Sequence, residues 1–394
     1  MQKKIDKSIL LFLILQPFLD VLTSIGIHNN WKGSISLLIR GAFFIFVLFY
    51  LVIKKKEKKG VFALIFYLII EMFYFYSSTT NALFSEAFNL IKLFYLPFLL
   101  LFFYHYENKS INEKLMTMLY FIYMNLIIIP YIFNIGFDIV YENKEGYLGL
   151  FYGGNELSAL FIGLLPIVLN FILAQKNLFL KLFFFLEIVM VMVLVGTKTL
   201  FLGIGLVFTL FILKGLKKNV QSFSKKRKSL MILAIGLFLL TSSLLIPKTP
   251  VYKNFKVTLN YYQIHSMKDF VSIDTIDKVI FSTRLSFLKN VHSYYKEREV
   301  KEKLFGIGIT KINKIKDIEI DVLDIFYSIG IIGFLIWFLF MILSIRKSKL
   351  EGIYQLSLFL FLFISLFSGH ILNKPMVSTF ISLLPLLNKN KKEE

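Results

Sequence analysis

The chain has no cysteine, and charged residues make up only 18% of its 394 positions. The missing thiols exclude a disulfide framework, a thiolate nucleophile and a zinc site built on cysteine. Hydrophobic residues reach 57%. A soluble chain of this length cannot hide so much apolar surface in one core, so the natural solvent for most of it is lipid.

Acidic residues are also scarce, with 25 Asp and Glu against 45 Lys and Arg and a net charge of +20. In a soluble protein this excess would favour a nucleic-acid partner. Here the basic residues lie mostly between apolar runs, which membrane topology explains more simply, so we expect no nucleic acid. The basic start, Met1 to Lys7, precedes an apolar run without a small-residue cleavage site, so we expect this segment to be retained as the first span.

What the chain has in abundance is apolar runs long enough to cross about 30 Å of hydrocarbon. We therefore expect an all-α polytopic membrane protein with about twelve transmembrane helices and one large extracytoplasmic helical loop. The run 179–213 is too long for one span, and Gly196-Thr197-Lys198-Thr199 marks a tight reversal between two. The predicted spans are 8–25, 34–53, 61–77, 86–104, 115–137, 155–174, 179–196, 198–213, 229–247, 323–344, 352–369 and 374–388.

The Lys and Arg residues in the connections orient these spans. With the N-terminus inside, the inner segments hold 25 Lys and Arg, whereas the short outer loops hold 4, and long translocated loops are exempt from this count. Both termini are thus expected in the cytoplasm, and the Lys-, Ile-, Phe- and Asn-rich composition is typical of an AT-rich bacterial genome. The expected organisation is spans one to nine in 1–247, the outer loop with amphipathic helices in 248–322, spans ten to twelve in 323–388 and a cytoplasmic tail in 389–394.

The long polar insert, residues 248–322, carries an apolar pattern with helical spacing at Ile276, Ile280, Leu288 and Val291. Arg284 lies four residues from Ile280 and four from Leu288, so it falls within this stripe. An arginine there can snorkel at a membrane surface. It can also bind an anion, since a guanidinium fits phosphate oxygens and stays charged at any pH.

Each of the predicted spans one to four carries a charged residue within it, namely Asp20, Arg40, Glu71 and Lys92. Each costs about 2.5–3.5 kcal/mol to insert and usually needs a partner or a wet cavity. One interpretation is a structural set of ion pairs, such as Glu71 with Arg40 or Lys92. The other is a polar cavity that opens outward and is basic enough to hold an anion.

Further polar residues gather at the expected outer ends of the spans. Lys198 lies in a Gly-Thr-Lys-Thr turn that resembles part of a phosphate-binding loop, although the full P-loop pattern is absent. His370 is either a hydrogen-bonded wedge or a proton-transfer group. Glu319, Asp321 and Asp324 open span ten, where capping and the helix dipole favour acids, although one could act as a base or orient an arginine. Too few His and carboxylate residues gather for us to expect a metal site.

These outward-facing segments together resemble the O-antigen ligase/polymerase superfamily, the Wzy-type membrane glycosyltransferases of the GT-C class. The resemblance covers most of the chain and rests on short motifs in a shared order. They are Gln16-Pro17-Phe18-Leu19-Asp20, Gly154-Asn155-Glu156 with Pro166, Gly196-Thr197-Lys198-Thr199, Thr283-Arg284, Leu304-Phe305-Gly306-Ile307-Gly308, Glu319-Ile320-Asp321-Val322-Leu323-Asp324 with Gly330 and Gly333, and Ser368-Gly369-His370.

The resemblance implies inverting glycosyl transfer at the outer face of the plasma membrane, without metal, cofactor or nucleotide sugar. The implied partners are an oligosaccharide linked to undecaprenyl pyrophosphate, membrane lipid and other polysaccharide assembly proteins. Arg284 matches the family arginines that hold the pyrophosphate, and the base is left open among Asp321, Glu319 and His370. The remaining candidates for substrate binding are Lys198, Arg40, Lys92, Asn155, Glu156, Asp324 and Asp20.

Three activities fit this resemblance. The Glu-x-Asp-x-x-Asp segment and the late Gly-His resemble capsule or exopolysaccharide polymerases of Gram-positive bacteria, which join lipid-linked repeats. A ligase would move finished polymer to another anchor, but His265 and His292 in the insert do not match the ligase pattern around its essential histidine. A lipid-linked oligosaccharide flippase would show two related halves and short loops, whereas this chain has no evident repeat and one large insert.

Overall fold

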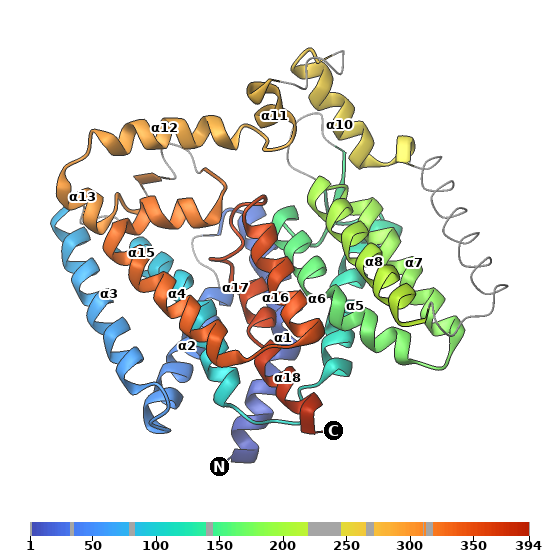
Figure 1. The fold of residues 1–394 in the computed structure, drawn as a ribbon, viewed down its shortest axis with the longest axis horizontal. Coiled ribbons are helices and arrows are strands. Elements are labelled where there is room, and N and C mark those ends of the chain that lie inside the picture. The colour runs from blue at the N-terminus through green and yellow to red at the C-terminus, as the bar shows by residue number, and fades with distance from the viewer. Residues whose placement is uncertain are drawn as a thin grey trace.

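The computed structural model describes residues 2–31, 35–78, 83–138, 145–219, 246–264, 272–309, 311–312 and 318–393, and these form an almost entirely helical bundle (Figure 1). A two-stranded antiparallel hairpin, β1 (Phe137–Asp138) with β2 (Tyr147–Gly149), interrupts the helices of the N-terminal part. These helices are α1 (Gln2–His28), α2 (Ile35–Ile53), α3 (Lys58–Ser78), α4 (Leu83–His105), α5 (Glu113–Ile132), α6 (Gly154–Ala174), α7 (Leu178–Val195) and α8 (Lys198–Asn219).

The C-terminal part begins with the insert and returns to the bundle. It consists of a 3-10 turn, η2 (Ile246–Lys248), followed by α10 (Pro250–Tyr261), α11 (Ile273–Val279), α12 (Arg284–Lys296), α13 (Val300–Phe305), α15 (Asp321–Ser348), α16 (Gly352–Ser365), α17 (Pro375–Ile381) and α18 (Leu384–Glu393). The predicted ninth span, 229–247, lies outside the described residues up to residue 245.

Seven described helices are long and apolar enough to cross a membrane, namely α1, α2, α4, α5, α6, α7 and α15. Shorter apolar helical stretches occur at Lys198–Phe211 and Gly352–Ser365. The predicted all-α polytopic class is confirmed, and the number of about twelve spans stays a prediction. The last predicted span, 374–388, is two short helices, α17 and α18, because Pro385 cannot continue a helix from the preceding turn.

Helices α4 and α6 form the centre of the bundle. Of the apolar window of α6, 78% is buried, compared with 17% for α7. Large apolar side chains on α7 and α8, such as Phe179, Leu186 and Leu202, are more than two-thirds exposed. Such surface is stable only against lipid, so α7 and α8 lie at the periphery and face the bilayer.

In two spanning helices, a proline leaves a backbone carbonyl without its helical N–H donor. In each case a donor from elsewhere in the chain bonds that carbonyl. Proline has no N–H, so Pro97 leaves the carbonyl of Leu93 without its helical partner, and the indole Nε1–H of Trp337 donates to that carbonyl at 3.0 Å. Pro130 likewise frees the carbonyl of Leu126, which accepts the N–H of Leu150 at 3.2 Å. Lipid offers no hydrogen bonds, so these repairs fix α15 against α4 and the hairpin against α5.

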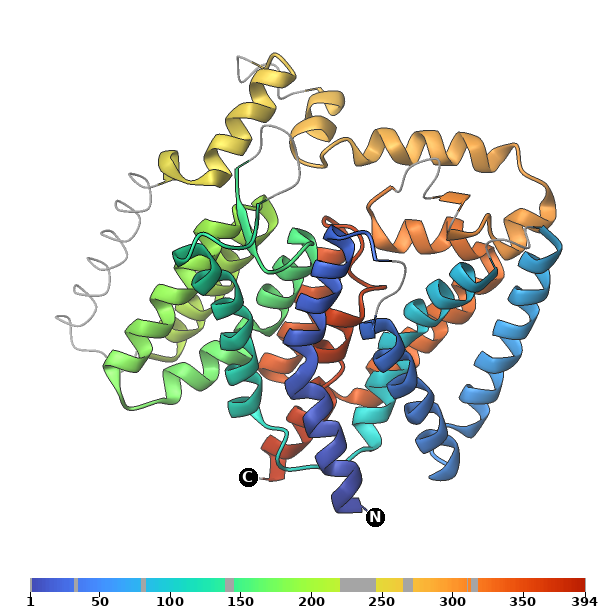
Figure 2. The same ribbon diagram turned by 180° about the vertical axis from the view of Figure 1, so that it is seen from behind.

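Helix α15 changes direction at Gly330, which has φ 67° and ψ −174°. Its first part runs across the end of the bundle, and the part after Gly330 descends into it (Figures 1 and 2). The carbonyls of Tyr327 and Ser328, just before the kink, accept the N–H groups of Ile307 (3.2 Å) and Gly308 (3.0 Å). The Leu304–Gly308 motif therefore supplies bonds that a straight helix would have made itself.

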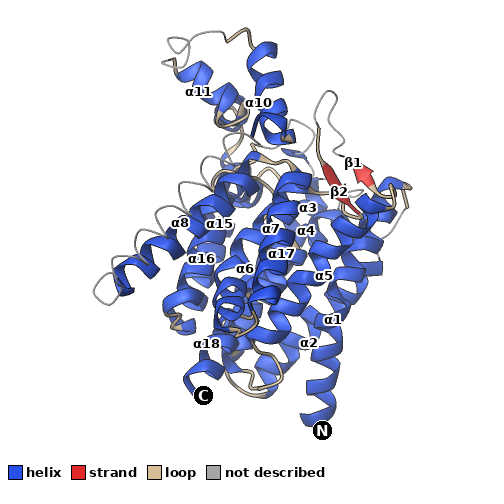
Figure 3. Cartoon of the chain, turned by 90° about the vertical axis from the view of Figure 1, so that its right-hand side faces the viewer, coloured by secondary structure: helices blue, strands red, loops and turns tan. Residues whose placement is uncertain are grey.

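The two termini lie together at one end of the bundle, and the insert covers the other end (Figures 1 and 2). In the side view, α10 and α11 stand beyond the ends of the spanning helices, on the side opposite both termini (Figure 3). This arrangement separates the molecule into a terminal face and an insert face.

Candidate active site at the insert face

A cavity of about 1780 Å³ lies at the insert face. Its walls come from the last turns of α1, the first halves of α2 and α4, the starts of α6, α8 and α15, the helices α10 to α12, the end of α16 and the connection between α16 and α17. All eleven residues that the sequence places at the site line this cavity, and their roles stay predictions. Its charged lining consists of Arg40, Lys92, Lys198, Lys278, Arg284 and Lys374 with Asp20, Glu156, Glu319, Asp321 and Asp324, beside His370.

Arg284 begins helix α12 and turns inward. The expected continuous stripe from Ile276 to Val291 is wrong, because Ser282 (φ 53°) and Thr283 (φ 69°) break it into α11 and α12. Asp277 fixes this break, since its carboxylate accepts the N–H groups of residues 285 and 286 at 2.8 and 2.9 Å. Asp277 thus caps α12 and sets the direction in which Arg284 leaves the turn.

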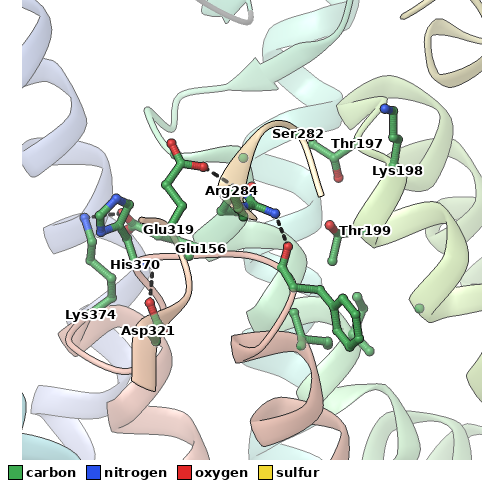
Figure 4. Close-up of a pocket in the computed structure, with 18 of the residues that line it drawn as sticks. Glu156, Thr197, Lys198, Thr199, Ser282, Arg284, Glu319, Asp321, His370 and Lys374 are labelled. Atoms are coloured by element: carbon green, nitrogen blue, oxygen red, sulfur yellow. Dashed lines mark hydrogen bonds and ion pairs between the residues drawn. The ribbon is translucent and has the colours of Figure 1, made fainter. Parts of the chain in front are cut away.

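The Arg284 side chain is buried, with 8% of the residue exposed, so it does not snorkel on the surface. Its Nη2 donates to Glu319 Oε2 at 2.9 Å, and its Nη1 donates to the carbonyl oxygen of Phe367 (Figure 4). A guanidinium has five N–H donors in a fixed fork. These two bonds hold the fork at the cavity wall and leave donors for a ligand.

The segment 367–372 beside Arg284 is held by Asp321. The Asp321 carboxylate is buried and accepts three backbone N–H groups, those of His370, Ile371 (2.8 Å) and Leu372 (2.7 Å). Gly369 makes room for this contact, because a Cβ there would come within 2.4 Å of the Cα of Glu319. One carboxylate therefore places both His370 and the carbonyl that Arg284 binds.

The predicted reversal between the seventh and eighth spans is confirmed. Gly196 ends α7 in the left-handed region, at φ 63°, and α8 begins at Lys198. Lys198 Nζ donates to the carbonyl of Val279 at 3.0 Å and lies 5.7 Å from the ring centroid of Phe255. Lys198 thus connects the bundle to the two helices of the insert that roof the cavity, α10 and α11.

Arg40 and Asp20 form a buried ion pair, with Nη2 and Oδ1 2.6 Å apart. Arg40 also donates to Gln16 Oε1, at 2.9 Å from Nε and 2.8 Å from Nη2, and Asp20 accepts the hydroxyl of Tyr123 at 2.5 Å. The expectation of an ion pair within the membrane is right, but Asp20 is the partner of Arg40 rather than Glu71, which is buried on α3 near Tyr67. Both residues also line the cavity, so the pair is buried at its wall.

On the other side of His370, Glu156 pairs with Lys374 at 2.6 Å (Figure 4). Lys92 of α4 and Asn155 of α6 line the same part of the cavity. Asp324, in contrast, accepts the N–H of Ile318 at 2.9 Å and stabilises the start of α15. Its place in the first turn of α15 matches the helix-dipole interpretation of acids at this helix N-terminus, while the N-cap residue Ile320 makes no side-chain cap.

The roof contributes one further cation, Lys278 of α11. It bonds Asp274 at 2.5 Å, and this hydrogen bond raises the pKa of Lys278. Among the described residues, no three His, Asp or Glu side chains gather in a metal-binding arrangement.

Comparison with protein families matches residues 2–273 and 271–387, nearly the whole chain, to the family described as O-antigen ligase like membrane protein. The chain belongs to this family. No curated protein and no solved structure matches it.

Membership makes this O-antigen ligase-like protein a multi-pass membrane protein of a glycosyltransferase type, concerned with lipid-linked polysaccharide. Ligases are expected to have an essential histidine in this insert. In the described part of the insert, no histidine lines the cavity. His292 bonds the hydroxyl of Tyr327 at 3.0 Å and is not part of the cavity lining, and His265 lies outside the described residues.

Two residues of the O-antigen ligase-like site were missed in the sequence. Asp277 looked like one of several acids in the insert, and only its distance of seven residues from Arg284 hinted at a turn between them. Lys374 was counted for topology alone. The sequence clue to Lys374 was that it is the last cation before a long uncharged stretch. A charge in that position needs an acidic partner such as Glu156.

Proposed function

We propose that this protein is a polysaccharide polymerase. It transfers a glycan from undecaprenyl pyrophosphate to a hydroxyl of another lipid-linked repeat at the outer face of the plasma membrane. The observation that carries the proposal is the buried Arg284, whose guanidinium is oriented by Glu319 and Phe367 at the wall of a large cavity. A planar, permanently charged fork of this kind suits a diphosphate.

In the proposed reaction, the acceptor hydroxyl oxygen attacks the anomeric carbon of the donor glycan. The bond between that carbon and the pyrophosphate oxygen breaks, the hydroxyl proton passes to a base, and the lipid pyrophosphate leaves. Pyrophosphate is already a good leaving group, so the protein chiefly needs a cation for the developing charge and a base for the hydroxyl. Arg284 is the proposed cation.

We assign the base to His370. Both oxygens of Asp321 are occupied by backbone N–H groups, and Glu319 is committed to Arg284, so neither carboxylate is well placed to take a proton. The imidazole of His370 lines the cavity while its backbone is fixed by Asp321. Glu319 and Asp321 then act as positioning residues.

The walls of the cavity also support a lipid substrate. Part of the lining is apolar, with Phe201, Leu202 and Leu206 on α8, Phe363 on α16, and Phe367 just after the end of α16. Several of these side chains are exposed, Leu202 to 69% and Phe363 to 41%. A prenyl chain could lie along this wall with its pyrophosphate at Arg284, so that the lipid enters from the bilayer.

The orientation belongs to the same proposal. The sequence holds 25 Lys and Arg in the segments expected inside against 4 in the short outer loops, which supports a cytoplasmic terminal face by the positive-inside rule. The insert face, with its cavity, then lies outside, where lipid-linked repeats are presented for polymerisation.

Complementation tests the role of Arg284. A strain that lacks this protein is supplied with the wild type, Arg284→Ala, or Lys289→Ala, which removes an exposed cation from the same helix α12 outside the cavity. We expect no polymer with Arg284→Ala and normal polymer with Lys289→Ala, at equal amounts of protein in the membrane. Polymer of normal length with Arg284→Ala would contradict the assignment.

A further inference from the structure

The cavity holds a second group of cations apart from Arg284. Lys92 projects from α4, a spanning helix, and Lys374 lies at the N-cap of α17. In Figure 4, Lys374 lies across Glu319 and His370 from Arg284, so the two groups are at different places in the cavity. The second group is built from α4, α6 and α17, none of which carries Arg284 or its partners.

The charges of this second group do not cancel. Lys374 pairs with Glu156 at 2.6 Å, and both lie within electrostatic range of the Lys92 ammonium. Glu156 is thus already paired with Lys374, whereas Lys92 contacts a neutral group, Asn89 Oδ1, at 3.5 Å. Holding an excess positive charge on a spanning helix is costly unless an anion or water offsets it.

The neutral groups around these lysines are hydrogen-bond donors that suit an anion. The side chains of Asn89, Asn155 and Asn373 line the cavity, and each amide carries an NH₂ group that can donate to an anion. Helix α6 begins at Gly154 without a side-chain cap on Gly153, and both glycines line the cavity. The positive end of a long helix adds to the field of Lys92 and Lys374.

We infer that Lys92 and Lys374 form a second phosphate-binding site, which holds the diphosphate of a second lipid-linked substrate. This inference rests on the proposed function, in which donor and acceptor each carry a prenyl diphosphate. Arg284 holds the diphosphate that leaves, and the Lys92 site holds the one that stays on the product. An enzyme with a single lipid-linked substrate would need only the first site.

The test counts bound lipids rather than product. Native mass spectrometry of the full-length protein with undecaprenyl pyrophosphate gives the number of molecules bound, and uncharged undecaprenol gives the number that the tail alone accounts for. We expect two pyrophosphate-dependent molecules on the wild type and on Lys289→Ala. We expect one on Lys92→Met, one on Arg284→Ala, and none on the double variant.

The variants are chosen so that misfolding does not imitate the result. Lys92→Met replaces the amine with an apolar side chain of similar length on a spanning helix, and Lys92→Arg keeps the charge and should still bind two molecules. We expect the second binding step to weaken at least about tenfold in Lys92→Met, the scale of one charge-assisted hydrogen bond. Lys374→Met should weaken the same step.

Two lipids on Lys92→Met, or a single lipid on the wild type that Arg284→Ala removes, would overturn the second site. The latter result would leave the Arg284 site intact. Two sites on the wild type together with no chain elongation by the purified protein would instead contradict the polymerase and leave the second site standing. The two failures are therefore distinguishable.

Discussion

Arg284 and Glu319, 35 residues apart in sequence, meet at 2.9 Å between Nη2 and Oε2 at the wall of the cavity. The pair joins the first residue of α12 to the segment that leads into α15, and the bond from Arg284 to the carbonyl of Phe367 links the insert to the bundle. Arg284 is the more enclosed partner, with 9% of its side chain exposed against 30% for Glu319. Removing Glu319 should therefore mainly affect Arg284, the more buried partner.

Replacing Glu319 with alanine should leave the buried Arg284 with one partner fewer and a less defined orientation. We expect a loss of activity of about tenfold or more, the scale of one hydrogen bond to a charged group. Glu319→Gln keeps an acceptor oxygen and should retain more activity than Glu319→Ala in the same polymer assay. If glutamine is as harmful as alanine while the protein accumulates normally, Glu319 acts through its charge or as a base.

Asp321→Ala should destabilise the folded protein and not only reduce its activity. Three backbone N–H groups lose a charged acceptor in a buried place, which costs roughly 3 kcal/mol or more. We expect a clear fall in the midpoint of thermal unfolding in detergent, with a smaller fall for Asp321→Asn. A variant with normal unfolding but no activity would return Asp321 to the role of general base.

Gly330→Ala should prevent normal folding at the kink of α15. Its φ of 67° disfavours any side chain, and a Cβ would lie 2.3 Å from the backbone nitrogen of Gly306. We expect a loss of more than about 3 kcal/mol and little protein in the membrane. Gly205→Ala on α8 is the matched control, because a Cβ there meets nothing within 4 Å, and it should accumulate like the wild type.

The buried pair of Arg40 and Asp20 allows a test by double substitution. Arg40→Met leaves the Asp20 carboxylate uncompensated and should cost about 3–5 kcal/mol. Adding Asp20→Leu removes that charge, so the double variant should be more stable than Arg40→Met alone in the same detergent unfolding measurement. If the losses of stability from the two substitutions simply add in the double variant, the pair does not act as one structural unit. Its position at the cavity wall then matters more.

The sequence indicated the class of the molecule and much of the cavity, because both depend on local signals. Apolar runs of membrane length predict spans, and glycine between two such runs predicts the reversal at Gly196, which has the left-handed φ that the turn needs. Every short motif at the expected outer ends contributes at least one residue to the same cavity, except Leu304–Gly308, which bonds the kink of α15 instead. Their common side of the membrane follows from alternating spans, so their meeting could be anticipated.

The sequence alone could not predict which residues pair between helices. The sequence suggested Glu71 as a partner for Arg40, whereas the structure pairs Arg40 with Asp20, because the choice depends on which helices pack together. The break between α11 and α12 was hidden because the apolar spacing continues through it, and only the capping by Asp277 shows the turn. The kink at Gly330 likewise depends on the distant Leu304–Gly308 segment.

The central claim is that cations of the insert-face cavity bind lipid-linked repeats while the protein joins them into longer chains. The most direct measurement incubates purified protein with lipid-linked single repeats and resolves the products by length. The wild type should build longer lipid-linked chains, and Lys289→Ala should do the same, whereas Arg284→Ala should leave single repeats. Repeats that stay single with the wild type, while pre-assembled polymer moves to another anchor or repeats only cross a vesicle membrane, would contradict the account.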